Sequence, residues 1–123
     1  MEVLTTTVSV TTTGIDGAAV GSSVSEYLYG FLLDVYLNYH ASCPATADVT
    51  LAHTNPLMGN IFVKSNNATD IRIVPRDPCV NVAAAAITDS YDYHVLSGTL
   101  TLSVAEANAL TDCVVATIRW LKL

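Results

Sequence analysis

The sequence is short of charged residues, and of basic residues in particular. Its 123 residues include five Lys and Arg against eleven Asp and Glu, which gives a net charge of −6, and only 13% of the chain is charged. Soluble domains on average carry about twice that share. Five cations cannot neutralise many phosphates, which argues against nucleic-acid binding. The 51% share of hydrophobic residues is too high for a disordered chain.

Long apolar runs are also missing. The longest, residues 28–33 and 82–87, are far shorter than the roughly 20 residues that a membrane-spanning helix needs, so we expect no membrane contact. The N-terminus lacks the charged and apolar regions of a signal peptide, and we therefore expect synthesis and folding in a cytosol.

Signatures of catalysis and of metal binding are absent too. The sequence contains no nucleophile elbow, phosphate-binding loop or dinucleotide fingerprint. The histidines His40, His53 and His94 have no ligand partners at recognised spacings. We therefore expect no metal, no other cofactor and no enzymatic activity.

The three cysteines are far apart and odd in number. Cys43, Cys79 and Cys113 form no C-x-x-C pair, so we expect small buried or half-buried side chains. One disulfide with one free thiol is the alternative.

What the sequence does have is a hydrophobic period of two. In residues 26–40 every odd position from Tyr27 to Tyr39 is apolar or aromatic, which predicts a long strand with these side chains on one face and a bulge or bend near Gly30. Shorter alternating segments recur about every ten residues between turn residues. They predict one all-β domain over residues 1–123, an antiparallel β-sandwich of jelly-roll-like form with seven or eight strands. The shorter segments are residues 4–10, 49–53, 61–64, 71–73, 91–95, 100–104 and 114–120.

Three segments leave alternatives open. The alanine-rich residues 82–88 are compatible with a helical turn, a packed loop or an extended segment, and residues 105–112 predict a loop with one turn of helix. Residues 89–94 are rich in Asp and Tyr, as a sugar- or cation-binding loop would be. Their alternation favours a strand instead, with Tyr91, Tyr93 and Val95 facing inward and Asp92 and His94 facing water.

Several segments together resemble a family of viral proteins. Residues 30–39 read G-x-L-x-x-V-Y-L-x-Y, residues 48–51 read D-V-T-L, and residues 98–120 form a closing G-T-L-T-L-S-V … A-T-I-R-W pair. A Thr/Val-rich start at residues 3–13 and a proline-containing middle at residues 73–78 complete the pattern. The chain is in these respects similar to the small β-sandwich or jelly-roll decoration (cement) proteins of tailed bacteriophage capsids.

The resemblance implies a structural role in the virion. Such a protein is made in the host cytoplasm, binds the major capsid protein on the outer surface of the head as a homotrimer, and stabilises contacts between capsid subunits. Residues 1–13 would then form an extended or edge-pairing arm. Expected contact residues are Val3, Thr5, Thr7, Val8, Val10, Arg72, Arg76 and Asp77. The alternatives are a tail or head-fibre protein, or a carbohydrate-binding adhesin module that uses Tyr36, Tyr91 or Tyr93.

Overall fold

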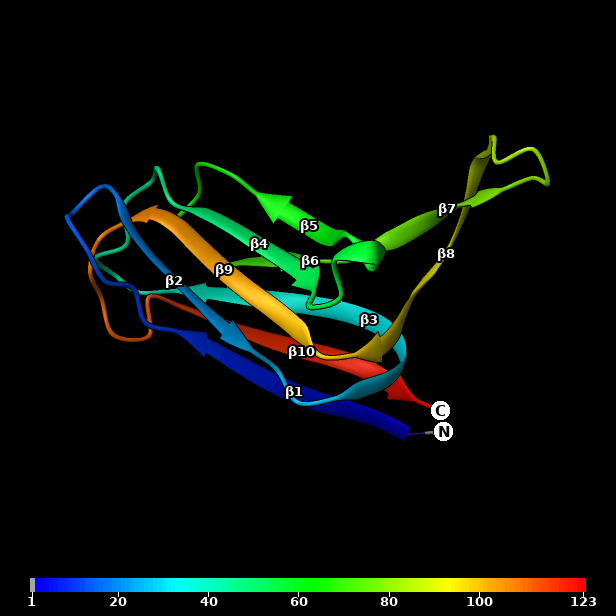
Figure 1. Ribbon diagram of the computed structural model, residues 1–123, viewed down its shortest axis with the longest axis horizontal. Helices are drawn as coiled ribbons and strands as arrows, with labels where there is room; N and C mark the ends of the chain where they lie inside the picture. Colours follow the sequence, from blue (N-terminus) through cyan, green and yellow to red (C-terminus); the bar gives the residue numbers. More distant parts are fainter. Residues whose placement is uncertain (1) are drawn as a thin grey trace.

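The computed structural model describes residues 2–123 and contains two antiparallel β-sheets packed face to face (Figure 1). The predicted all-β sandwich is confirmed. One short 3₁₀ turn, η1 (Pro56–Met58), follows β4. The strands are β1 (Glu2–Val10), β2 (Ala19–Val24), β3 (Leu28–Tyr39), β4 (Asp48–His53), β5 (Asn60–Lys64), β6 (Ile71–Ile73), β7 (Arg76–Val80), β8 (Ala86–Gly98), β9 (Leu100–Ala107) and β10 (Val114–Lys122).

The order of the strands is that of a jelly roll. One sheet has six strands: it runs β1-β10-β3-β8-β7, and β6 also pairs with the second half of β3. The other sheet runs β2-β9-β4-β5. Every pairing is antiparallel, and the chain crosses from one sheet to the other between β1 and β2. Without β7 and β8, the remaining eight strands form two layers of four, β1-β10-β3-β6 and β2-β9-β4-β5, which is the jelly-roll arrangement. We call the sheet that contains β1, β10 and β3 sheet A, and the other sheet C.

The structure has ten strands, so the predicted number of seven or eight was too low. The two strands that the sequence did not predict are β2 and β7. Residues 14–21 contain three Gly and residues 75–78 contain two Pro, which indicated turns. Both strands lie at sheet edges, where such residues are tolerated because one side of the backbone needs no partner strand.

The core lies between the two sheets and follows the predicted alternation. In β4, β9 and β10 every second side chain is buried, and the alternating polar residues face outward. Trp120 also donates a hydrogen bond from Nε1 to Oγ1 of the buried Thr6 at 3.0 Å. The large side chains that are completely buried include Leu28, Leu32, Leu37, Leu51, Leu96, Leu100, Leu102 and Ile118.

The prediction that all odd positions of residues 27–39 share one face was wrong for the first half of β3. Arg119 pairs with Asp34 and Trp120 with Leu32, so Leu33 is an extra residue at a bulge. The bulge reverses the alternation: Leu32 faces the core before it, and Val35 faces the core after it. The predicted bulge near Gly30 therefore lies three residues further along the chain.

Gly30 has a different role, which is close packing between strands. A Cβ atom placed on Gly30 would lie 1.9 Å from the carbonyl oxygen of Leu121 on β10. No other residue fits here unless the backbone of β10 moves.

The most prominent departure from a compact sandwich is a projecting hairpin. Residues 94–98 of β8 pair with the start of β3, but the rest of β8 pairs only with β7. Figure 1 shows this hairpin extending from one end of the molecule. We call residues 76–93 the arm; the alanine-rich residues 82–85 form the turn at its tip.

The structure corrects two local predictions, one for residues 91–95 and one for residues 105–112. Tyr91, Tyr93 and Val95 are exposed rather than facing inward, because the two tyrosines lie on the arm outside the sandwich and Val95 lies on the outer face of sheet A. His94 is instead the side chain that turns toward the sandwich. Residues 105–112 contain no turn of helix, since β9 continues through Ala107 and a turn follows.

Candidate functional site

Three hydrogen-bonded side chains, Asp77, His94 and His53, link the base of the arm to sheet C, and we call them the histidine chain. Nδ1 of His94 lies 2.9 Å from Oδ1 of Asp77 on β7, and Nε2 of His94 lies 2.7 Å from Nε2 of His53 on β4. Because a carboxylate only accepts, Nδ1 of His94 carries the proton, and in the contact between the two Nε2 atoms one ring donates and the other accepts. The contact therefore requires that at most one of the two rings is charged.

His53 is the more buried of the two rings. Burial lowers the pKa of His53, the nearby His94 lowers it further, and Asp77 opposes both effects. Nδ1 of His53 is buried and has no hydrogen-bond partner among the described residues.

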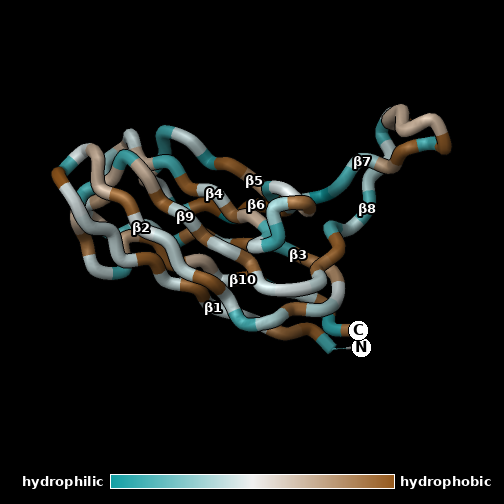
Figure 2. The backbone as a smooth tube through the Cα atoms, viewed as in Figure 1, coloured by the Kyte–Doolittle hydropathy of each residue, from teal (hydrophilic) through white to brown (hydrophobic). Residues whose placement is uncertain are grey.

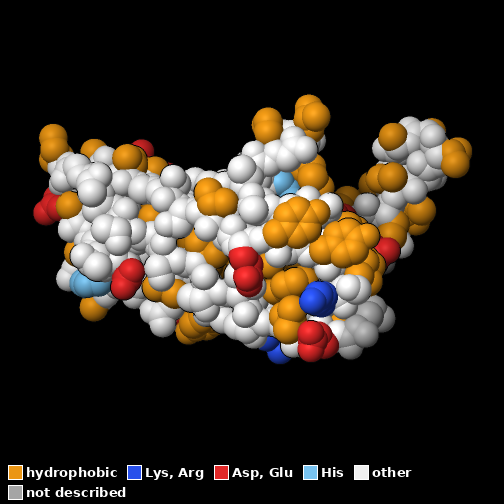
Figure 3. Space-filling model, turned by 60° about the horizontal axis from the view of Figure 1, so that its bottom comes forward, with side chains coloured by type: hydrophobic (Ala, Val, Ile, Leu, Met, Phe, Trp, Pro, Cys, Tyr) orange, Lys and Arg blue, Asp and Glu red, His pale blue; other side chains and the backbone are white. Residues whose placement is uncertain are grey.

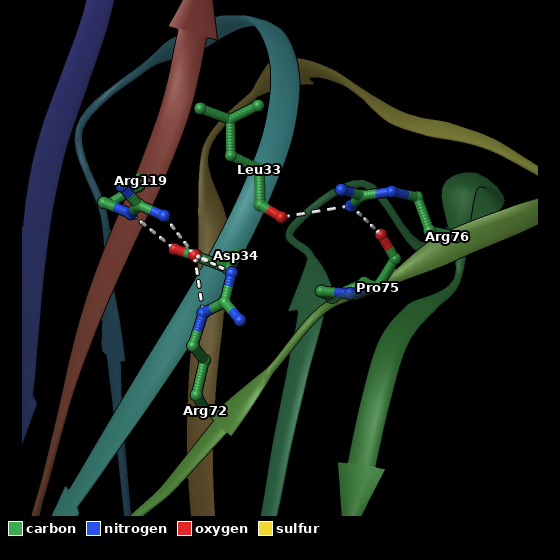
Figure 4. Close-up of polar contacts among 6 residues, drawn as sticks. All are labelled: Leu33, Asp34, Arg72, Pro75, Arg76 and Arg119. Atoms are coloured by element: carbon green, nitrogen blue, oxygen red, sulfur yellow. Dashed lines mark hydrogen bonds and ion pairs between the residues drawn. The ribbon is translucent and has the colours of Figure 1, made fainter.

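A second polar cluster lies on the outer face of sheet A (Figure 4). Asp34 on β3 accepts from Nε of Arg119 on β10 at 2.8 Å and from Nε of Arg72 on β6 at 2.9 Å. We call these three residues the arginine clamp. The hydrogen bond from Arg119 is the main cause that lowers the pKa of Asp34, burial opposes it, and Arg72 adds to the lowering. Two cations around one carboxylate leave the clamp with a net charge of +1.

Arg76 fixes the base of the arm to the sandwich. Its Nη1 donates to the carbonyl oxygens of Leu33 at 3.0 Å and Pro75 at 2.7 Å (Figure 4). Its guanidinium also lies 4.4 Å from the ring centroid of Tyr93, a cation–π distance. The carbonyl it reaches belongs to the bulge residue of β3, so the bulge provides the anchor for the arm.

An apolar row crosses four strands beside the arginine clamp. Strand register places Val3 opposite Leu121, Leu121 opposite Phe31, and Phe31 opposite Val95. We call these four residues the outer apolar row. Val3 and Val95 are exposed, and Phe31 and Leu121 are half-buried. Figure 3 shows hydrophobic side chains gathered where the arm leaves the sandwich and again at the tip of the arm.

The expected contact residues fall into two groups. In β1, Val3, Thr5 and Thr7 are exposed, whereas Val8 and Val10 are buried in the core. The predicted N-terminal arm is largely a regular edge strand, because β1 pairs with β10 along all nine residues from Glu2 to Val10.

The other three expected contact residues have partners within the chain. Arg72 belongs to the arginine clamp, Arg76 to the anchor of the arm, and Asp77 to the histidine chain. Sequence reasoning pointed to them because polar residues flank Pro75 and Pro78. It missed Asp34, Arg119 and His53 as their partners, since these lie on strands that only the fold brings near.

Two cysteines are buried next to one another. Sγ of Cys113 lies 3.8 Å from Sγ of Cys43, and both are free thiols, while Cys79 is half-buried on the arm. Burial and the neighbouring Cys113 raise the pKa of Cys43 to about 12. All three cysteines are thus buried or half-buried, as the sequence predicted.

Within residues 2–123 no group of three or more His, Cys, Asp or Glu side chains is arranged to hold a metal ion. No helix in this part of the chain is long and apolar enough to cross a membrane. No protein-family model, no curated protein and no solved structure matches the chain.

Proposed function

We propose that this chain is a non-enzymatic structural protein of a virion, a decoration protein that binds the outer surface of a tailed-phage head. The jelly roll is compatible with this role, because the fold is used by viral capsid proteins. It is used by lectins and other proteins as well, so the fold alone does not decide the function.

The observation that carries the proposal is the arm. Its tip bears the exposed apolar side chains Val80, Val82 and Ile87, and the hydropathy colouring of Figure 2 shows an apolar tip far from the core. A two-stranded hairpin is only marginally stable in water by itself. An apolar hairpin that projects from a small domain is suited to bind a surface on another protein, which is what an assembly protein needs.

Co-sedimentation with phage heads that lack their decoration protein tests this proposal. Val82→Asp places a charge at the tip of the arm, and we expect it to reduce binding at least about tenfold, the effect of losing one well-buried contact. Ile15→Asp is the matched control, because Ile15 is also an exposed apolar residue and belongs to the loop between β1 and β2, which Figure 1 shows at the end of the sandwich opposite the arm. Failure of the unmodified chain to bind any such head would refute the proposal.

Deleting residues 1–13 is not a suitable test. Val8 and Val10 are buried in the core, and β1 forms one edge of sheet A. Removing them would unfold the protein rather than remove a contact. Thr5→Asp and Thr7→Asp, on the exposed face of β1, test the expected contact at that strand without disturbing the core.

The second candidate is a carbohydrate-binding module. The observation in its favour is that Tyr91 and Tyr93 are exposed on the same face of the arm, where aromatic rings can stack on sugars. Arg76 already covers one face of Tyr93, so Tyr91 offers the freer ring. Glycan-array binding that Tyr91→Ala abolishes would favour this candidate over the decoration protein.

A further inference from the structure

The arm is acidic as well as apolar. Between Asp77 and Tyr93 the sequence contains three Asp and no Lys or Arg. Asp77 and Asp92 pair directly across β7 and β8, and like charges at directly opposed positions destabilise a strand pair. Asp77 has His94 as a partner, whereas no cation of the chain is paired with Asp92 among the described residues. A partner surface that supplies cations would stabilise the arm.

The outer face of sheet A has the opposite charge. The arginine clamp has a net charge of +1 in a chain of net charge −6. The side chains of Arg72 and Arg119 remain 59% and 51% exposed while they hold Asp34, which is 5% exposed. Their outer N–H groups are therefore available to a carboxylate from another molecule.

The outer apolar row lies next to the clamp on the same face. Arg119 and Leu121 are two residues apart on β10, which places both on the outer side of the sheet. The row crosses four strands, roughly 14 Å at the usual spacing of strands, and a five-residue strand such as β7 is roughly 17 Å long. The arm therefore matches the row in length and in apolar character, and it matches the neighbouring clamp in charge.

Among the described residues of its own chain, the arm touches this face only at its base, where the ring of Tyr93 lies 6.2 Å from that of Phe31. The end of β8 is held in sheet A beside β3, and the rest of the hairpin points away from the sandwich (Figure 1). We infer that the arm of one copy docks on the outer face of sheet A of a second copy, with Asp92 at the arginine clamp and its apolar tip over the outer apolar row. Such a contact joins two different surfaces, so repeated copies close into a ring when the rotation between neighbours allows it.

This inference builds on the proposed assembly role, but it is tested on the purified chain alone. Light scattering after size exclusion should give a mass at least twice the 13.0 kDa of one chain. Val82→Asp should raise the dissociation constant about tenfold or more, while Ile15→Asp should leave it unchanged. A monomer at every accessible concentration, or equal effects of the two variants, would overturn the inference.

Crosslinking between two variants tests which surfaces meet. In a Cys79→Ser background, one copy carries Val82→Cys at the tip of the arm and another carries Thr117→Cys on the outer face of β10. A short bismaleimide should link the mixture much more efficiently than either variant alone. Ser22→Cys, on the exposed side of β2 in sheet C, is the matched control for the position on sheet A.

The two proposals fail in different ways. Tip-to-tip or face-to-face links as abundant as the mixed link, or equal links to Ser22→Cys and Thr117→Cys, would overturn docking between copies. Binding of undecorated heads by a chain that stays monomeric would leave the decoration role intact and remove only this inference.

Discussion

Replacing Asp34 by Asn tests whether the arginine clamp stabilises the fold. The substitution keeps the shape of the side chain but removes its charge, so Arg72 and Arg119 lose their shared counter-ion. The new amide also brings N–H donors toward guanidinium groups that only donate. The folded state should therefore lose stability relative to the unfolded chain.

The size of the effect follows from the burial of the cluster. Breaking a fully buried ion pair costs about 3–5 kcal/mol, and an exposed pair contributes less than about 1 kcal/mol. Asp34 is buried, but both arginines reach solvent, so we expect a loss of about 2 kcal/mol. With a urea dependence of about 2 kcal/mol per molar, the unfolding midpoint should fall by about 1 M.

Fluorescence of Trp120 provides the assay. It is the single tryptophan, it is buried, and its indole N–H is bonded to Thr6 inside the sandwich. Urea titrations of the unmodified chain and of Asp34→Asn at neutral pH give the difference in free energy of unfolding. Tyr36→Phe, on the same outer face and without a change of charge, is the control and should leave the midpoint nearly unchanged.

The pH dependence of the stability is a second test of the same prediction. The pKa of Asp34 is lower in the folded state than its ordinary value of 3.8, so the unfolded state binds the proton more readily. The stabilisation is complete well above pH 3.8 and is lost as the pH falls through the folded pKa. The difference in the free energy of unfolding between the unmodified chain and Asp34→Asn should therefore shrink as the pH falls. A difference below about 0.5 kcal/mol at neutral pH, the range of an ordinary surface substitution, would refute the reasoning.

Three further predictions concern other features of the molecule. Because the pKa of His53 is lowered from 6.5 in the folded state, the free energy of unfolding should fall as the pH drops below 6.5. Urea titrations at several pH values should show a weaker fall for His53→Gln, and an unchanged pH dependence would contradict this prediction. Gly30→Ala should cost at least about 2 kcal/mol in the same assay, because its Cβ would collide with the Leu121 carbonyl; a stability equal to that of the parent would contradict it. In the native protein a thiol reagent should modify Cys79 rapidly and the buried Cys43 and Cys113 only on unfolding; rapid labelling of all three would show that the sandwich opens readily.

The clamp and the histidine chain show which parts of the site no local pattern predicts. Asp34 and Arg119 are 85 residues apart in the sequence, and His53 and His94 are 41 apart. Each of these residues, taken alone, is an ordinary polar residue in an alternating strand. Their pairing depends on the register between strands, and one bulge at Leu33 decides that Asp34 faces the arginines rather than the core.

The alternation of apolar and polar side chains determined the sandwich by itself. Side chains on a strand point to opposite faces in turn, so segments such as residues 100–104 and 114–120 specify which side of each strand is buried without reference to any other segment. Turn residues likewise determined where most strands end. The composition determined that charge is scarce and mostly negative.

Only the tertiary structure decided which strands are neighbours, and therefore what the surfaces present. Tyr91, Tyr93 and Val95 alternate as a buried strand would, yet they are exposed, because no second sheet covers the arm or the outer face of sheet A. Burial of one face requires another element at the right place, and the sequence of a strand does not contain that information. The arm, the clamp and the outer apolar row are all results of this long-range placement.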